Sequence, residues 1–401
     1  MAIEIKKVET ISDLRRFVDF HYDLYKDCPY DVPSLFMAEM NTLRSDRNAA
    51  FDFCEAAYFM AYKDGRMVGR IAGILNPRAN ERWQTKDVRF GWIDFIDDIE
   101  VSRALFNAVE EWGRSKGMTA IVGPLGFTDF DPEGMLTMGF DKLSTMETIY
   151  NYEYYPQHME QLGGWVKDND YVEYYLPMPD KTPEKFAKIA EMIEKRYNLH
   201  VRKVTRKDIR NGYARELFKI INETYKDLYG FVSLTERQID QYVNTYLPAL
   251  DLSLVTVIVD GNKNNKIAGV GITIPSLARA VRKCRRGRLF PFGWWHLLRA
   301  VKCHKTEGVD LLLIGFLPEY RAKGANALLF SDLIPRYIKY GFKWGETNVE
   351  MEENSSVRGQ WDTIEHINHK RRRCYRKQLV PETQTQGSSM ASKEDTHVGI
   401  K

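Results

Sequence analysis

The stretch that decides the fold reads Leu317-Pro318-Glu319-Tyr320-Arg321-Ala322-Lys323-Gly324-Ala325-Asn326-Ala327-Leu328-Leu329. An unbroken apolar run over residues 311–316 precedes it, long enough for a buried strand and too short for a helix. A helical pattern follows, and its apolar face is made by Ala327, Leu328, Leu333 and Ile334. The sequence thus indicates a strand, then a turn with one glycine and two cations, then a helix. In this arrangement successive backbone N–H groups point towards one place. The helix dipole adds positive charge there, so the sequence predicts a site for a phosphate or pyrophosphate.

Two other interpretations of this turn are open to consideration on the residues alone. A strand–glycine–helix connection is common in α/β proteins for purely structural reasons, and that interpretation stays open. A dinucleotide-binding turn is disfavoured, because its fingerprint needs three glycines and this turn has only Gly324.

The turn resembles the pyrophosphate loop of the GCN5-related N-acetyltransferase (GNAT) superfamily, which binds acyl-coenzyme A. The shared residues are Pro318-Glu319-Tyr320-Arg321, Lys323-Gly324 and Leu328-Leu329. The family usually has glycine where Ala322 and Asn326 stand, but these changes keep the backbone amides. The resemblance implies that the acyl-CoA co-substrate is bound by Phe316, Leu317, Arg321, Ala322, Lys323, Gly324, Ala325 and Asn326, with Asn354 contacting it after the next strand.

The chain of 401 residues, 44% of them hydrophobic, has the size and composition of two globular domains. Its five cysteines are scattered, which predicts free thiols in a reducing cytosol. Residues 1–7 alternate like a strand and not like a signal peptide, and no apolar run approaches the length of a membrane span. We therefore expect a cytoplasmic protein.

The order of the expected elements repeats at a period of roughly 200 residues. In residues 1–180, and again in residues 195–379, the order is strand, helix, hairpin, strand, helix and strand. Both halves fit the GNAT topology, so we expect an α/β fold with a mixed sheet and two tandem GNAT-like domains. Residues 380–401 are rich in Thr, Gln, Ser and Gly, which predicts a disordered tail.

The two halves differ at the turn that would bind the pyrophosphate. After the expected strand over residues 90–95, the first half reads Ile96-Asp97-Asp98-Ile99-Glu100, with three acids and no glycine. Carboxylates at this point would repel a pyrophosphate. We expect that the first half has lost cofactor binding and that only the second half binds acyl-CoA.

The strand expected after the loop and its helix carries alternating polar residues, namely Glu346, Asn348, Glu350 and Glu352. Alternation places them on one face, where a carboxylate of raised pKa could take the proton of an amine. A solvated strand face is an equally good interpretation. The candidate base is Glu346 or Glu352. Where the GNAT family often supplies a tyrosine as proton donor, this chain has Trp361, so Tyr375 on the expected last strand is the candidate donor.

An acidic loop over residues 128–134 carries Asp129, Asp131 and Glu133. It lacks the glycine and the ligand spacing of a calcium loop, so we expect no metal site there. The loop is interpreted as structural or as part of the acceptor site.

An insertion over residues 276–305 concentrates the positive charge of the chain. The net charge is +3, but nine Lys and Arg residues and no acid lie between Arg279 and Lys305, which leaves the remainder at net −6. These cations surround Leu289-Phe290-Pro291-Phe292-Gly293-Trp294-Trp295. Cations around aromatic rings favour contact with an anionic membrane. The alternatives are a hairpin packed on the core with the Trp pair buried, and a nucleic-acid surface.

Further motifs resemble a bacterial subgroup of tandem GNAT proteins that includes bacterial ceramide synthases. They are Asp64-Gly65-Arg66-Met67-Val68-Gly69-Arg70-Ile71-Ala72, Gly123-Pro124 with Gly139-Phe140-Asp141, Asn151-Tyr152-Glu153-Tyr154-Tyr155 and Tyr229-Gly230-Phe231-Val232-Ser233-Leu234-Thr235. The resemblance implies an N-acyltransferase that moves a long fatty acyl group from acyl-CoA or another thioester to a lipid amine, such as a sphingoid base, at the inner membrane face. A tRNA-dependent aminoacyltransferase of the peptidoglycan-bridge type and a regulator that senses acyl-CoA are the alternatives.

Overall fold

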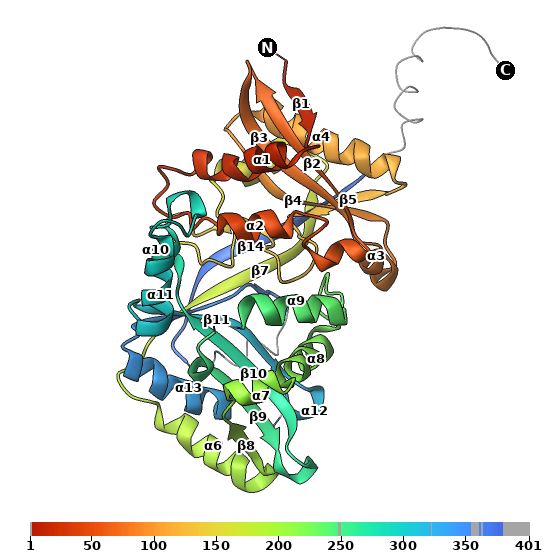
Figure 1. Ribbon diagram of the computed structural model, residues 1–401. Helices are drawn as coiled ribbons and strands as arrows, with labels where there is room; N and C mark the ends of the chain where they lie inside the picture. The colour runs from red at the N-terminus through yellow and green to blue at the C-terminus, as the bar shows by residue number, and fades with distance from the viewer. Residues whose placement is uncertain (1, 248–249, 322, 354–360, 362–363, 380–401) are drawn as a thin grey trace, which may run out of the picture.

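The structure is a computed structural model that describes residues 2–247, 250–321, 323–353, 361 and 364–379. Ala322, Asn354 and the tail over 380–401 lie outside the described residues. The chain forms two halves of helices and strands, one above the other in Figure 1.

The elements follow one another in a similar order in both halves. The first half contains β1 (Glu4–Lys7), α1 (Ile11–Leu24), α2 (Phe36–Thr42), β2 (Glu55–Lys63), β3 (Arg66–Leu75), α3 (Pro77–Trp83), β4 (Asp87–Phe95), α4 (Ile99–Ser115), β5 (Ala120–Gly123), β6 (Met135–Met138), α5 (Tyr154–Leu162) and β7 (Val166–Pro177). The second half contains α6 (Glu184–Tyr197), β8 (Leu199–Arg202), α7 (Arg206–Arg210), α8 (Tyr213–Tyr225), α9 (Glu236–Tyr246), β9 (Val255–Asp260), β10 (Lys266–Pro275), α10 (Ala278–Val281), α11 (Gly293–Cys303), β11 (Gly308–Phe316), α12 (Pro318–Arg321), α13 (Asn326–Tyr340), β12 (Trp344–Thr347), β13 (Glu350–Met351) and β14 (Ile367–Gln378).

The strands of both halves form one continuous sheet, ordered β1-β2-β3-β4-β5-β14-β7-β12-β11-β10-β9-β8. Two short strands lie off this path, since β6 pairs with β14 and β13 pairs with β7. The pairs β4–β5 and β11–β12 are parallel, and hairpins such as β2–β3 and β9–β10 are antiparallel. The predicted α/β fold with a mixed sheet is confirmed.

Each half has helices on both faces of its part of the sheet, because apolar residues alternate along the strands. In β2, Tyr58 and Met60 pack with α1 and α2, whereas Ala57 and Phe59 pack with α4 on the opposite face. The second half repeats this arrangement. Buried residues of β9 pack with α8 on one face and with α6 and α13 on the other.

The last strand of each half lies in the sheet of the other half. Strand β7 pairs with β12, where Glu346 lies opposite Tyr175. Strand β14 pairs with β5, where Tyr375 lies opposite Gly123. A boundary between residues 180 and 195 therefore divides the sequence, but it does not divide the sheet into two complete units (Figure 1).

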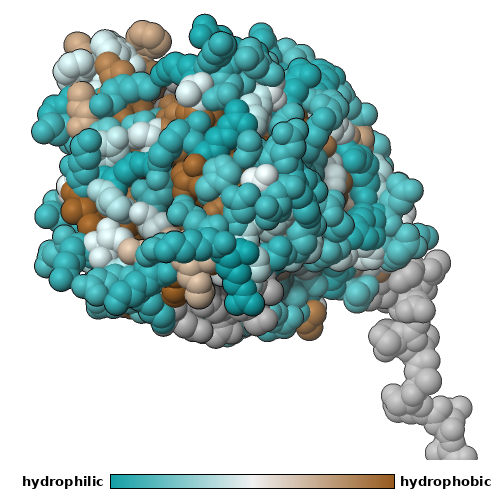
Figure 2. All heavy atoms as spheres, turned by 90° about the horizontal axis from the view of Figure 1, so that it is seen from below, coloured by the Kyte–Doolittle hydropathy of each residue, from teal (hydrophilic) through white to brown (hydrophobic). Residues whose placement is uncertain are grey.

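Seen from below, the surface is mostly hydrophilic and its apolar residues form small, separate patches (Figure 2). No helix in the described part of the chain is both long and apolar enough to cross a membrane. The insertion over 276–305 carries an unusual group of exposed large apolar side chains, namely Phe290, Phe292, Trp294, Trp295 and Leu298. The interpretation in which the Trp pair is buried is therefore wrong.

Candidate active site between the two halves

The second half has a point where two parallel strands part. Strands β11 and β12 pair only from Gly308 opposite Trp344 to Leu311 opposite Thr347. Strand β11 then continues to Phe316, while β12 ends. The register of β11 against β10 also shifts between Leu311 and Leu313. At this point the Oδ1 atom of Asn348 is buried and has no hydrogen-bond partner among the described residues. A ligand with a polar group could satisfy this atom.

The predicted pyrophosphate loop lies at the end of β11. Helix α13 begins at Asn326, and its N-cap residue Ala325 makes no side-chain hydrogen bond to the first turn. The N–H groups of Ala327 and Leu328 donate to the carbonyls of Gly324 at 2.9 Å and Ala325 at 3.2 Å. The turn therefore offers an anion its helix dipole and no capping carboxylate. Gly324 has a φ of +72°, a left-handed conformation that glycine adopts without strain.

The side chains of the loop mostly hold its shape. The Arg321 guanidinium donates to the carbonyl of Phe316 at 3.0 Å and to that of Thr224 at 2.9 Å. Lys323 lies 4.6 Å from the centre of the Tyr320 ring. Phe316 and Leu317 are buried in the core beside α13. Within this loop, the backbone and Lys323 remain as candidate contacts for a phosphate.

Glu346, the first candidate base, lies in a buried ion pair. Its carboxylate accepts from Lys370 and is 3.2 Å from Nε2 of His369. Burial opposes ionisation, but Lys370 and the contact with His369 lower the pKa of Glu346. A buried carboxylate that is already paired is a poor proton acceptor. Its contacts fit a structural role.

The other two candidate catalytic residues lie elsewhere. Glu352 is 2.7 Å from the guanidinium of Arg371. Tyr375 is buried in the core of the first half, where burial raises its pKa to about 12. Strands β7 and β12 lie between its own strand, β14, and β11. The structure therefore does not bring Glu346, Glu352 and Tyr375 together.

The predicted shared face of Glu346, Asn348, Glu350 and Glu352 is also wrong, because the strand is interrupted between β12 and β13. Glu350 instead faces the layer of α13, and both of its carboxylate oxygens accept from Nε1 of Trp361, at 3.2 and 3.0 Å. Trp361 packs against Phe330 of α13. Burial raises the pKa of Glu350 to about 8, so at neutral pH this carboxyl is mostly protonated and can donate.

A second pair of carboxyl groups comes from the first half. The hydroxyl of Tyr171 donates to Oε2 of Glu133 at 2.8 Å. Burial raises the pKa of Glu133 to about 7, and burial together with Glu133 raises that of Asp129 further. Tyr225 donates to the carbonyl of Ile314, on the part of β11 beyond the parting. Burial raises the pKa of Tyr225, and the carboxyl groups of Glu350 and Asp129 add to this increase.

The first half closes the corresponding region with its own side chains. At the turn between β4 and α4, Oδ1 of Asp98 accepts from the N–H of Glu100 at 3.0 Å, and Oδ2 accepts from Lys63 at 2.6 Å. Oδ1 of Asp97 is 3.0 Å from Nε2 of His158. The start of α4 therefore already has a carboxylate where α13 has no side-chain cap.

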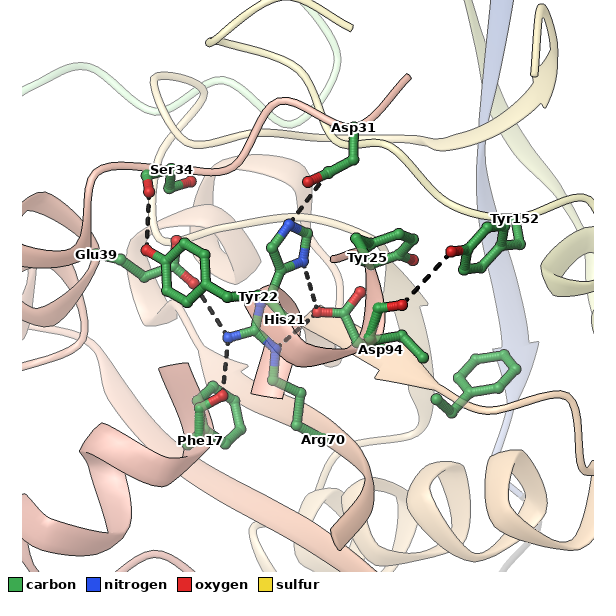
Figure 3. A network of polar contacts seen from close by, with 12 residues as sticks. Phe17, His21, Tyr22, Tyr25, Asp31, Ser34, Glu39, Arg70, Asp94 and Tyr152 are labelled. Carbon is green, nitrogen blue, oxygen red and sulfur yellow. Dashed lines mark hydrogen bonds and ion pairs between the residues drawn. The ribbon is translucent and has the colours of Figure 1, made fainter. Parts of the chain in front are cut away.

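Beside β4, a network of buried charges lines a small cavity (Figure 3). His21 is 3.2 Å from Asp31 and 3.1 Å from Asp94, and Arg70 donates to Asp94 at 2.7 Å and to Glu39 at 3.1 Å. Burial disfavours charge on His21, but the two aspartates raise its pKa to about 10. Each charged side chain of this network lies beside a partner of opposite charge, so the network fits a structural role.

The architecture has counterparts among solved structures. A tandem GNAT protein from the clavulanic acid biosynthesis pathway matches with a TM-score of 0.56 and 11% identity, over 95% of this chain and 100% of that chain. A GCN5-related N-acetyltransferase from Sphaerobacter thermophilus matches with a TM-score of 0.52 and 12% identity, over 94% of this chain and 96% of that chain. The chain has the tandem GNAT fold that its sequence predicts. No family model matches it.

Two proteins are similar over almost the whole sequence. "Protein YghO" from Escherichia coli (strain K12) is 30% identical over 381 residues, which cover 92% of this chain and 93% of that protein. "Bacterial ceramide synthase" from Caulobacter vibrioides (strain NA1000 / CB15N) is 27% identical over 386 residues, which cover 94% of this chain and 98% of that protein. The chain belongs to the same family as Protein YghO.

Proposed function

We propose that this protein is an acyl-CoA-dependent N-acyltransferase whose active site lies in the second half. One observation carries this proposal. Strand β11 leads from the parting to a helix N-terminus without a side-chain cap. Strand β13, which follows β12, carries Glu350 and pairs with Tyr171, the partner of Glu133, and the pKa of both carboxyl groups is raised. The helix end suits the pyrophosphate of CoA, and the carboxyl groups suit the proton transfers of amide formation. The tandem GNAT fold supports the same chemistry.

The reaction is a direct attack of an amine on the thioester, with no covalent enzyme intermediate. The N–H groups at the start of α13 and Lys323 would hold the pyrophosphate. After the amine attacks the carbonyl carbon, the C–S bond breaks and the thiolate needs a proton. Glu350 replaces Tyr375 as our candidate donor, because its pKa of about 8 is close to that of a thiol.

We propose that the acceptor is a lipid amine such as a sphingoid base, and that the donor carries a long fatty acyl chain. The similarity to a protein named bacterial ceramide synthase supports this choice. The insertion over 276–305 supports it independently, since it gives the protein a means of reaching a lipid that stays in a membrane.

Eight of the nine arginines and lysines of the insertion fall into two groups, and the ninth, Arg279, pairs with Glu307. Arg286 and Arg288 pair with Asp19 of α1, and Arg282 donates to the carbonyls of Cys28 and Pro29, so these three attach the insertion to the first half. A second group is exposed and has no ion-pair partner within the described residues, namely Lys283, Arg285, Arg299, Lys302 and Lys305. Near the exposed aromatic residues, each such cation would add about 1 kcal/mol of attraction to an anionic membrane.

The function is tested with purified protein, vesicles containing an anionic lipid, a sphingoid base, and either palmitoyl-CoA or acetyl-CoA. Mass spectrometry should detect the amide, with faster formation from palmitoyl-CoA. Absence of an amide with both donors would contradict the proposal. Formation of product only with an aminoacyl-tRNA would favour the peptidoglycan-bridge alternative.

The membrane contact has its own test, the double variant Phe290→Ser/Phe292→Ser. The two rings are 79% and 74% exposed, so their removal should leave the fold intact. Sedimentation with anionic vesicles should fall about tenfold or more, because each ring would bury apolar area in the interface. Activity on a water-soluble amine should stay at the wild-type level. Unchanged sedimentation would show that the insertion does not bind the membrane.

A further inference from the structure

The acidic loop of the first half reaches across to the second half. The Phe130 ring lies 5.0 Å from that of Tyr242 on α9 and 6.2 Å from that of Phe218 on α8. The hydroxyl groups of Thr128 and Tyr242 are 3.0 Å apart. These contacts hold the loop against α8, which packs on β9 to β11, and against α9, which packs on α8.

The end of the acidic loop is held in place as firmly as its beginning. Gly134 has a φ of +76°, and a Cβ atom there would lie 2.8 Å from Cβ of Arg372 on β14. The loop backbone therefore touches the central strands, and Glu133, the preceding residue, has little freedom of position. Its carboxylate accepts a hydrogen bond of 2.8 Å from Tyr171 on β7.

Tyr171 places this carboxylate beside the candidate active site. It pairs directly with Met351 of β13, the residue that follows Glu350. Tyr171 and Met351 pack together on one face, and Glu350 faces α13 on the other. Glu133 from the first half and Glu350 from the second half thus flank the same pair of strands from opposite faces.

We propose that the first half supplies a catalytic residue to the second half, with the partly exposed carboxylate of Glu133 accepting the proton of the acceptor ammonium and Tyr171 acting as its positioning residue. The inference rests on the proposed function. It also gives the first half a role in a reaction whose cofactor it does not bind.

The other carboxyl groups near this position are less suited to accept a proton. Asp131 accepts from the N–H of Thr128 at 3.0 Å and so holds the loop itself. Asp129 has a pKa raised well above its ordinary value, mainly by burial. For Glu133, burial raises the pKa to about 7, the hydrogen bond from Tyr171 and the charge of Arg89 lower it, and Asp131 raises it. At neutral pH Glu133 can therefore both accept a proton and release it.

The protons balance as follows. The ammonium nitrogen gives one proton to Glu133, and its lone pair forms the bond to the thioester carbon. The C–S bond breaks and the thiolate takes a proton from Glu350. Glu133 releases the first proton to water, takes up the second proton of the attacking nitrogen and releases that one too, while Glu350 recovers its proton from water. One amide, one thiol and one proton are produced.

The test is Glu133→Gln in the full-length protein, with Glu111→Gln on the exposed face of α4 as the matched control. The variant should lower kcat by about 100-fold or more while the affinity for acyl-CoA stays unchanged. The fall of wild-type kcat/KM below about pH 7 should also disappear, since the group that titrates there is gone. The control should behave as wild type in all three measurements.

Tyr171→Phe separates a positioning role from a structural one. It removes the hydrogen bond that lowers the pKa of Glu133, so the acid limb of the pH profile should move to higher pH. A merely structural tyrosine would change stability and leave the limb in place.

The outcomes distinguish this inference from the proposed function. If wild type makes the amide and Glu133→Gln matches it in rate and pH profile, the inference is wrong and the function stands. If wild type makes no amide with any donor, both are wrong. A Glu133→Gln variant that unfolds at a much lower temperature and loses acyl-CoA binding would instead assign a structural role to Glu133.

Discussion

The two halves of this protein share a fold and differ at one turn. In the first half Asp98 caps α4 and pairs with Lys63, and Asp97 contacts His158. In the second half α13 starts after Gly324 and Ala325 with no side-chain cap. A helix N-terminus can satisfy its N–H groups with its own carboxylate or with a ligand. From this comparison we propose that the choice at this turn, and not the fold, decides which half can bind a pyrophosphate.

The largest expected effect comes from closing the open turn, with Gly324→Glu. The new carboxylate would repel the pyrophosphate, and a residue with a Cβ would be strained at this φ. Acyl-CoA binding, measured by calorimetry, should fall below detection. Gly65→Glu is the matched control, because Gly65 has a φ of +74° in the β2–β3 hairpin and nothing within 4 Å of its Cβ position. Retained binding in Gly324→Glu would place the cofactor elsewhere.

Some buried acids of the protein are paired with a cation and others are not, and Arg70→Ala breaks a pair in the first half. It leaves Asp94 and Glu39 without their guanidinium partner. Breaking a buried pair in this way costs about 3–5 kcal/mol of unfolding free energy, which chemical denaturation would measure. Arg66→Ala, at an exposed position of the same strand, should cost less than about 0.5 kcal/mol. If Arg70→Ala also abolished acyl-CoA binding while folded, the first half would not be independent of the cofactor site.

In the second half, Glu350 accepts hydrogen bonds from Trp361 and has no ion-pair partner among the described residues. The effect of Glu350 on stability therefore depends on pH in the opposite sense to that of a paired acid. Its folded pKa of about 8 lies above the ordinary value of 4.5, so the folded state binds the extra proton between these values. The protonated carboxyl of Glu350 makes its full contribution to the free energy of unfolding below pH 4.5. This contribution decreases as the pH rises towards 8, by at most about 1.4 kcal/mol per pH unit.

Glu350→Gln tests this sign. The amide cannot ionise, so the variant should gain stability relative to wild type as the pH rises from 5 to about 8. Denaturant midpoints at several pH values would show the difference. Asp94 is the internal comparison, since Arg70 and His21 lower its pKa against burial and its contribution is instead lost as the pH falls. Parallel pH curves for wild type and Glu350→Gln would contradict the raised pKa.

The sequence predicted the features that depend on short segments. The loop was predicted from the apolar run over 311–316, Gly324 and the helical pattern that follows. The two halves of one fold were predicted from the repeated order of elements. The sequence did not reveal the exchange of β7 and β14, because strand partners are set by contacts distant in the sequence. Because β14 lies in the sheet of the first half, Tyr375 is buried in the core of that half.

The sequence did not reveal some of the site residues for the same physical reason, since their positions depend on contacts between distant segments. Alternation suggested one face for Glu346 to Glu352, but the strand breaks after Thr347 and sends Glu350 to Trp361. The position of Glu133 depends on a loop that crosses between the halves. The acids of that loop were visible in the sequence, but their partner Tyr171, 38 residues further on, was not.

The smallest expected effect comes from opening the closed turn, with Asp98→Ala. The variant loses the cap on α4 and the pair with Lys63, which should cost about 1–2 kcal/mol of unfolding free energy. It should not create a second cofactor site, because Asp97 still lies at the turn and no glycine allows a backbone cradle there. Calorimetry should therefore find one acyl-CoA per chain in both the variant and wild type. Two per chain in Asp98→Ala would show that a single carboxylate is all that keeps the first half from binding the cofactor. Two in wild type would show that the turns of the two halves are equivalent after all.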